Sequence, residues 1–394
     1  MTQLTLAWAI TLSSAFEGGN IRDYQQVAPG HFRIALPGES DQEGRNRQAN
    51  WYSFRLDGVR GKPLTIELTR LEGEYNYRPN KGAVTGDTPP YYSLDGRAWK
   101  PWEDFTYDGE TPKLVLRMTP QSDRLWVAHI PPYTSQHLDA LRRDAARHPA
   151  FREEVIGRTA GGRPMHRWRI TAPGDAAGRK VIWLMARQHS WEASTSWVAE
   201  GLVRYLLSDD AQAARIRRET VFVILPMCDP DGVARGGVRF NAHGFDLNRN
   251  WDSFVAEKMP EIAAQHAAVK SWLAGGGRID LFLTMHNTET AEYLEGPPGG
   301  RFQALGERLY SLLEQKTSFA PARGLSWAET TTTAGKPGRM TVVQGLWKDF
   351  RIPAFLTEQR VSFNAKLGRR PLTEDRLRYG GELAAALWMA VSRE

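Results

Sequence analysis

The pattern of apolar and polar positions changes once along the chain, near residue 131. Before that point short apolar segments of strand length recur, and clusters of Gly, Pro, Asp and Asn separate them. The segments are LTLAWAI, HFRIAL, WYSFRL, LTIELTRL, KLVLRM and RLWVAHI. Strands and turns at this spacing are typical of a β-sandwich. We therefore expect residues 1–130 to form an N-terminal all-β sandwich domain.

After residue 131 short apolar runs alternate with amphipathic stretches. The runs VIWLMA, VFVILPM, IDLFLTM and PAFLTE have the length of buried strands. The stretches HLDALRRDAARH, SWVAEGLVRYLLS, EIAAQHAAVKSWLA, FQALGERLYSLLEQ and ELAAALWMAVS are predicted to be helices. This alternation predicts an α/β fold with a mostly parallel or mixed central sheet wrapped by helices. The second predicted domain covers residues 131–394.

Composition limits the classes of function. Apolar residues at 41% and charged residues at 24% are ordinary for a globular chain of 394 residues. No apolar run reaches the ~18 residues of a membrane span, and no run of Lys and Arg is interleaved with aromatic residues. We therefore expect neither a membrane nor a nucleic-acid partner. The single cysteine, Cys228, excludes an internal disulfide framework. Because the apolar N-terminal stretch has no Lys or Arg before it, we expect a cytoplasmic protein.

The net charge of +6 is unevenly distributed along the chain. Residues 1–135 hold 15 Lys and Arg against 16 Asp and Glu, whereas residues 136–394 hold 36 against 29. Two interpretations of the basic excess stay open. It steers acidic substrates towards a cleft, or it only adds solubility.

Three polar residues at the ends of predicted strands have the pattern of a metal site. His189 and Glu192 follow VIWLMA as an H-x-x-E pair, and His286 ends IDLFLTM. Ligands of an open α/β sheet bind beyond the carboxyl ends of its strands. Two imidazoles and one carboxylate leave a fourth zinc position for water, which such a site activates. We predict one Zn²⁺ bound by these three side chains.

Further polar residues follow two other strands. Glu358 ends PAFLTE and is either a general base or the partner of a strand-end salt bridge. The turn-rich segment 226–252 follows VFVILPM, and its arginines can pair with a carboxylate or polarise a carbonyl. The residues of interest in this segment are Arg239, Asp246, Asn248 and Arg249.

In sequence order these residues resemble the motifs of the zinc metallocarboxypeptidases of the carboxypeptidase A superfamily. That family carries H-x-x-E, N-P-D-G, D-x-N-R-N, a lone His and a strand-end Glu, and this chain has HSWE, DPDG, DLNRN, TMHN and LTEQ. More narrowly, the chain is similar to the short bacterial form of the cytosolic carboxypeptidase subfamily. FEGGNI, WYSFRLDGVRG, YSLDGRAW and WVAHIPPYT are similar to the signatures of its N-terminal β-sandwich.

The resemblance implies roles for the residues of the predicted metal site. His189, Glu192 and His286 would bind zinc. Glu358 would be the general base and proton shuttle, and Arg239 would stabilise the oxyanion of the tetrahedral intermediate.

The resemblance also implies substrate contacts. Asn248 and Arg249 would bind the terminal carboxylate of the substrate, and Asp246 would hold the His189 ring. AGKPGRM is similar to a family segment that lines the pocket for the last side chain. Arg339 is therefore a candidate for recognising an acidic side chain, with Lys336 as a weaker one.

Two departures from the family pattern bear on substrate binding. Residues 311–378 contain no tyrosine ahead of the strand-end Glu, so we expect no tyrosine clamp on the peptide from this stretch. Trp191 in QHSWE replaces a small residue of the subfamily's H-P-G-E. We expect its ring near the cleft, where it restricts the upstream substrate residue.

These observations predict a zinc-dependent metallocarboxypeptidase that removes C-terminal amino acids from peptides or proteins, with acidic residues as a possible preference. Two alternatives stay open. One is a zinc-dependent N-acyl amino-acid deacylase or related amidohydrolase that uses the same metal set. The other is a non-catalytic peptide-binding member of the fold. The sequence indicates neither the physiological substrate nor the oligomeric state.

Overall fold

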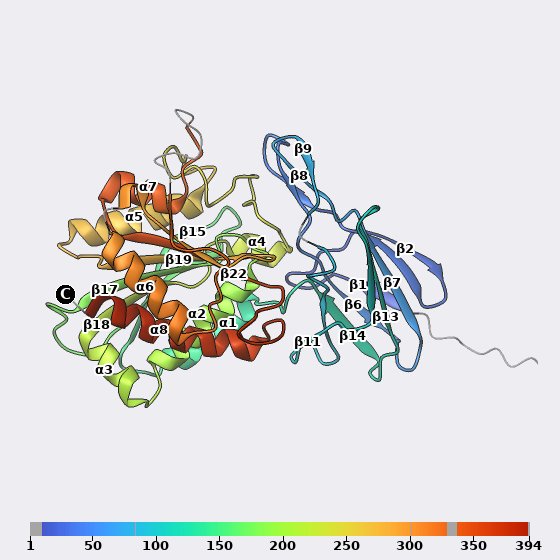
Figure 1. Ribbon diagram of the computed structural model, residues 1–394, viewed down its shortest axis with the longest axis horizontal. Helices are drawn as coiled ribbons and strands as arrows, with labels where there is room; N and C mark the ends of the chain where they lie inside the picture. Colours follow the sequence, from blue (N-terminus) through green and yellow to red (C-terminus); the bar gives the residue numbers. More distant parts are fainter. Residues whose placement is uncertain (1–9, 83, 301, 329–336, 393–394) are drawn as a thin grey trace, which may run out of the picture. The chain divides into compact units, whose positions relative to one another are not determined.

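The computed structural model describes residues 10–82, 84–300, 302–328 and 337–392. The chain divides into two compact units, Met1–Pro132 and Tyr133–Glu394, coloured from blue to green and from green to red in Figure 1. Within the described parts of the chain, every helix is either too short or too polar to cross a bilayer.

The N-terminal unit is built from β-strands. They are β1 Thr11–Ser13, β2 Asp23–Ala28, β3 His31–Ala35, β4 Glu39–Ser40, β5 Arg47–Gln48, β6 Ser53–Asp57, β7 Leu64–Thr69, β8 Gly73–Tyr75, β9 Arg78–Asn80, β10 Tyr91–Ser93, β11 Lys100–Pro101, β12 Phe105–Asp108, β13 Lys113–Met118 and β14 Arg124–Ala128. Two five-stranded sheets have the orders β1-β6-β14-β10-β11 and β12-β13-β7-β3-β2, and a third sheet is β4-β5-β8-β9.

Alternating side chains create the core of this unit. In β7 the buried residues Leu64, Ile66 and Leu68 alternate with partly exposed ones, as the two-residue period of a strand requires. Both five-stranded sheets contribute to one hydrophobic core, β6 through Phe54 and β13 through Leu114. The predicted strands after LTLAWAI coincide with β3, β6, β7, β13 and β14. LTLAWAI itself lies outside the described residues except for Ile10. The predicted β-rich character of the N-terminal half is confirmed.

The C-terminal unit is one mixed sheet with helices (Figure 1). Its elements are α1 Ser135–Ala145, β15 Phe151–Arg158, β16 Pro164–Ile170, β17 Lys180–Ala186, α2 Ala193–Leu206, α3 Ala211–Glu219, β18 Thr220–Leu225, α4 Pro230–Arg235, α5 Pro260–Ala274, β19 Leu281–Thr288, β20 Tyr293–Gly296, the 3-10 turn Pro298–Gly300, α6 Gln303–Lys316, β21 Ser326–Trp327, α7 Val342–Phe350, β22 Ala354–Arg360 and α8 Thr373–Ser392.

The centre of this sheet is parallel. The strand order is β15-β16-β18-β17-β19-β22-β20-β21, and the neighbours from β18 to β22 run parallel. The outer pairs β15–β16, β16–β18 and β20–β22 are antiparallel. In β17 every residue after Lys180 is buried, as expected for a parallel strand covered on both faces. The predicted α/β class with a mixed central sheet is confirmed.

Helices α2 and α8 cross so closely that two glycines are required at the crossing. A Cβ added at Gly201 would lie 2.0 Å from the backbone oxygen of Leu377, and one added at Gly380 would lie 2.2 Å from that of Val198. Real Cβ atoms essentially never come this near to a backbone oxygen, so a larger residue at either position must push the helices apart.

We expect Gly201→Ala to destabilise the C-terminal unit by about 1–3 kcal/mol through this overpacking. The measurement is the free energy of unfolding in urea. Gly324→Ala is the matched control, because an added Cβ there meets nothing within 4 Å, and we expect a change within about 0.5 kcal/mol. Equal stability of the two variants would contradict the close α2–α8 contact.

Candidate metal centre

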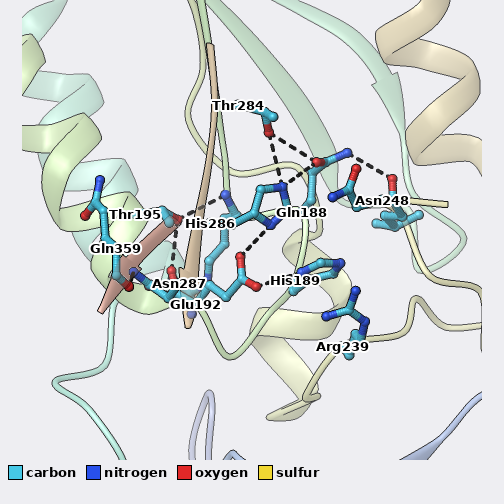
Figure 2. A network of polar contacts seen from close by, with 12 residues as sticks. Gln188, His189, Glu192, Thr195, Arg239, Asn248, Thr284, His286, Asn287 and Gln359 are labelled. Atoms are coloured by element: carbon cyan, nitrogen blue, oxygen red, sulfur yellow. Dashed lines mark hydrogen bonds and ion pairs between the residues drawn. The ribbon is translucent and has the colours of Figure 1, made fainter. Parts of the chain in front are cut away.

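Three buried side chains meet at the carboxyl ends of β17 and β19 (Figure 2). After β17 the backbone turns sharply, with φ of 63° at Arg187, and α2 begins directly after Glu192. The turn carries His189 and Glu192, and His286 stands on the neighbouring strand β19. One potential ligand atom from each residue lies within 4.8 Å of the other two. The structure thus brings together the three predicted metal ligands.

Hydrogen bonds define which nitrogen of His189 faces the centre. Its Nε2 lies 3.0 Å from Oδ1 of Asp246, and its Nδ1 lies 2.7 Å from Oε1 of Glu192. The pKa of the Asp246 carboxyl is well below its usual range, because Arg239 and His189 outweigh the cost of burying its charge. An ionised carboxylate only accepts hydrogen bonds. The Nε2–H of His189 therefore donates to Asp246, and Nδ1 is the nitrogen that faces Glu192.

The side-chain amide of Gln188 orients His286, so that its Nδ1 also faces Glu192. The Nε2 of His286 lies 3.0 Å from Oε1 of Gln188, an oxygen that can only accept. Nε2 of His286 therefore carries the proton, and Nδ1 presents its lone pair 3.0 Å from Oε2 of Glu192. Neither Nδ1 of His286 nor Oε2 of Glu192 has a hydrogen-bond partner among the described residues, although both atoms are buried.

These four facing atoms fit a zinc ion. Two nitrogen lone pairs opposite two oxygens of one carboxylate repel unless a cation or proton lies among them. Zinc binds imidazole nitrogens and carboxylate oxygens, each at about 2 Å. Burial opposes the charged form of Glu192, but positive charge on the two histidines outweighs burial and lowers its pKa to about 2. A metal cation at the same place favours the ionised carboxylate in the same way. The centre therefore keeps an ionised carboxylate for a cation.

Asp246 joins this centre to Arg239. Its Oδ2 accepts a hydrogen bond of 2.8 Å from Nε of Arg239, and its Oδ1 accepts one of 2.9 Å from the backbone of Asn248. The charges of Asp246, Glu192 and Glu358 all favour the Arg239 cation, whose pKa is raised despite its burial. Arg239 therefore supplies positive charge next to the three predicted metal ligands.

Glu358 lies on the strand next to His286. The β19–β22 register pairs the two residues directly, so their side chains lie on the same face of the sheet. Burial and the charge of Glu192 hold the pKa of Glu358 well above its usual range, and Arg239 only partly offsets them. Its Oε2 has no hydrogen-bond partner among the described residues. Glu358 is thus a carboxyl group that can hold a proton beside the three predicted metal ligands.

The other predicted residues lie on segments that contact one another. Oδ1 of Asn248 accepts a hydrogen bond of 3.0 Å from the backbone of Val342 at the start of α7, which leaves its Nδ2 donor for another partner. Nη1 of Arg249 donates to the Asn248 carbonyl at 2.8 Å. Arg339 is partly buried, and the backbone on both sides of it donates to the carboxylate of Asp252. The loop that carries Arg339 therefore contacts Asp252, two residues after the DLNRN segment. The other residue predicted in this loop, Lys336, lies outside the described residues.

Sequence reasoning missed a tyrosine beside Glu358. Tyr293 on β20 pairs directly with Glu358, so His286, Glu358 and Tyr293 form one row across three strands. The guanidinium carbon of Arg323 lies 4.0 Å from the centre of the Tyr293 ring. Burial and the charge of Glu358 raise the pKa of Tyr293. Tyr293 lies before residues 311–378 in the chain, and strand register rather than sequence order places it beside Glu358.

Trp191 is buried between the predicted metal ligands His189 and Glu192. Its side chain is only 2% exposed, and its backbone N–H donates to the Val238 carbonyl at 2.9 Å. The ring is therefore buried in the turn that carries His189 and Glu192, and its expected restriction of the upstream substrate residue stays a prediction.

Two family models match the chain. The zinc carboxypeptidase model matches residues 137–295, and the cytosolic carboxypeptidase N-terminal domain model matches residues 12–130. An uncharacterised protein of Zymomonas mobilis is 29% identical over 287 residues, which are 72% of this chain and 69% of that protein. Human cytosolic carboxypeptidase 2 is 28% identical over 277 residues, 64% of this chain. The matched region is only 30% of the human protein.

Solved structures share the fold over nearly the whole chain. A metallo-carboxypeptidase from Burkholderia cenocepacia has a TM-score of 0.82 at 24% identity, covering 97% of this chain and 99% of that one. A metallo-carboxypeptidase from Pseudomonas aeruginosa, solved with (2-guanidinoethylmercapto)succinic acid, has a TM-score of 0.81 at 21% identity, covering 96% and 98%. The chain belongs to the zinc carboxypeptidase family, as a metallocarboxypeptidase with a cytosolic carboxypeptidase N-terminal domain ahead of its zinc carboxypeptidase domain.

Proposed function

We propose that the chain is a cytoplasmic zinc enzyme that hydrolyses the last peptide bond of peptides or proteins. One observation carries the proposal: Glu358, a carboxyl with a raised pKa and an unpartnered buried oxygen, stands directly across from the metal-ligand residue His286. A metal that activates water, beside a group that transfers protons, is one arrangement that hydrolyses an unactivated amide.

A zinc ion held by His189, Glu192 and His286 would supply the Lewis acid that polarises the scissile carbonyl and activates water. Glu358 takes the proton of the attacking water and later gives it to the leaving amine. Its raised pKa suits both transfers, because a catalytic acid–base group works best when its pKa is near the working pH. Arg239 faces the carbonyl oxygen with a fixed positive charge and stabilises the oxyanion.

The terminal carboxylate of the substrate would be bound by the DLNRN segment. Asn248 offers its Nδ2 donor, since its Oδ1 is already engaged by Val342. Arg249 offers a guanidinium, which pairs with a carboxylate through two parallel hydrogen bonds. This pair restricts hydrolysis to the last residue of a chain.

A preference for acidic C-terminal residues is supported by the arginines around this segment. Arg323 stacks on Tyr293 in the row that contains Glu358, and both Arg323 and Arg249 act on the charge of Glu295. Arg339 lies in the loop held by Asp252. We propose Arg339 and Arg323 as the residues that attract an acidic side chain.

The proposed function is tested with peptides that differ only in the last residue, read by mass spectrometry. We expect release of single C-terminal residues, and no release from the same peptides with an amidated C-terminus, because Arg249 then has no carboxylate to bind. Acyl amino acids in the same panel test for a deacylase. Cleavage of acyl amino acids but of no peptide would contradict the carboxypeptidase proposal, and binding without any cleavage would favour a peptide-binding protein.

The acidic preference is tested with Arg339→Ala and Arg323→Ala. We expect kcat/KM for a Glu-terminated peptide to fall about 10- to 100-fold, the effect of losing a charge-assisted hydrogen bond, and kcat/KM for an Ala-terminated peptide to change little. Arg60→Ala in the N-terminal unit is the control. Release of aliphatic residues but not of Glu or Asp by the parent protein would rule out the preference.

A further inference from the structure

We infer that Gln188 is a positioning residue with two tasks: it fixes the tautomer of His286 for metal binding, and it ties His286 to the segment proposed to bind the substrate's carboxylate. The inference deepens the proposed function and rests on it. Gln188 is completely buried and stands between Arg187 and His189, so it is part of the turn that carries two of the proposed metal ligands.

Both ends of the Gln188 amide are engaged (Figure 2). Its Oε1 lies 3.0 Å from Nε2 of His286 and accepts a hydrogen bond of 3.2 Å from the hydroxyl of Thr284. Its Nε2 donates to the backbone carbonyl of Leu247 at 2.9 Å. These contacts join the turn after β17, the strand β19 and the DLNRN segment.

The Leu247 carbonyl determines which way the amide faces. A carbonyl oxygen only accepts, so the amide nitrogen of Gln188 must face Leu247 and the amide oxygen must face His286. That oxygen in turn requires the proton of His286 to be on Nε2. Nδ1, 3.0 Å from Glu192, is then the only nitrogen of His286 that can bind a metal. A partner that holds the second nitrogen of a metal-binding histidine typically contributes 10- to 100-fold to metal affinity.

The same amide links metal binding to carboxylate binding. Leu247 lies between Asp246, which bonds His189, and Asn248. Its carbonyl also accepts a hydrogen bond of 2.9 Å from Nε1 of Trp251, so this part of the segment is held rigidly. The DLNRN segment is therefore attached to both metal-binding histidines, through Asp246 at one and through Gln188 at the other.

We expect Gln188→Met to weaken zinc binding by about 10- to 100-fold and to raise KM, because the variant loses the acceptor for His286 and the donor to Leu247. Gln188→Glu keeps an oxygen opposite Nε2 of His286 but loses the donor to Leu247, so its zinc affinity should fall less than that of Gln188→Met while its KM also rises. Gln265→Leu is the matched control: Gln265 on α5 is also a buried glutamine, at 2% exposed, and we expect its loss to leave zinc affinity unchanged.

Zinc affinity is measured on the full chain by competition with a chelator of known Kd, a readout that needs no peptide hydrolysis. Zinc binding by Gln188→Met as tight as the parent's would overturn the inference, as would equal weakening in Gln188→Glu or in Gln265→Leu. If Gln188→Met does not fold, Thr284→Val takes its place in the comparison. It removes a hydroxyl bonded to the same amide oxygen, and we expect it to weaken zinc binding by a smaller factor. A parent protein that binds no zinc would instead contradict the proposed function.

Discussion

Glu358→Gln should lower kcat for peptide hydrolysis by about 10²- to 10⁴-fold, the usual contribution of a general acid–base group. The substitution keeps the shape of the side chain but removes its ability to accept a proton from water and return it to the leaving amine. Because Glu358 is not among the three proposed metal ligands, the variant should still contain zinc. The measurement is kcat on one peptide together with the zinc content of the same sample.

Glu289→Gln is the control for this experiment. Glu289 adds to the negative potential at Glu358 but does not pair with His286 in the sheet. We expect near-parental kcat from Glu289→Gln. Full activity of zinc-loaded Glu358→Gln would show that the proton is carried by another group, and Tyr293, the neighbour of Glu358 in the same row, is then the next to test.

The parts of the fold that could be predicted are those whose signal is local. The central strands are apolar along their whole length because helices cover both faces, so β17 and β18 stand out in the sequence. β15 was missed because its residues after Phe151 are mostly exposed and polar. α7 is only nine residues long, and its start is marked by a capping box at Thr341 rather than by a long apolar stripe. The predicted fold class and the family resemblance are confirmed.

The site residues likewise divide into those marked by the local sequence and those that depend on contacts across the sheet. His189, Glu192, His286 and Glu358 were found because each directly follows or ends a predicted strand, and the carboxyl ends of parallel strands meet at one edge of the sheet. Their roles stay predictions until tested. Gln188 and Tyr293 depend on contacts that cross the sheet, from Gln188 to His286 and from Tyr293 to Glu358. A sequence pattern does not contain strand register, so neither residue was predicted.

Glu192→Gln should lower zinc affinity by well over 100-fold, because losing a ligand costs more than the 10- to 100-fold loss of a supporting partner. Both oxygens of Glu192 face imidazole nitrogens, at 2.7 Å and 3.0 Å, so the substitution replaces an oxygen opposite one of the two histidines by an amide nitrogen. Zinc that binds only the folded chain stabilises it by about 4 kcal/mol at a free concentration of about 1,000 Kd. We expect this stabilisation in the parent protein and its loss in Glu192→Gln, measured as the zinc-dependent shift in urea unfolding.

Glu261→Gln is the matched control, since Glu261 is another fully buried glutamate, hydrogen-bonded at 2.9 Å to Asn241 rather than to a histidine. We expect Glu261→Gln to keep the stabilisation by zinc even if its stability without zinc changes. The unfolding experiment separates the two effects, because it compares each variant with itself in the presence and absence of zinc. A zinc-dependent shift that survives in Glu192→Gln would mean that the ion binds elsewhere, and Glu358 would then have no metal-activated water to deprotonate.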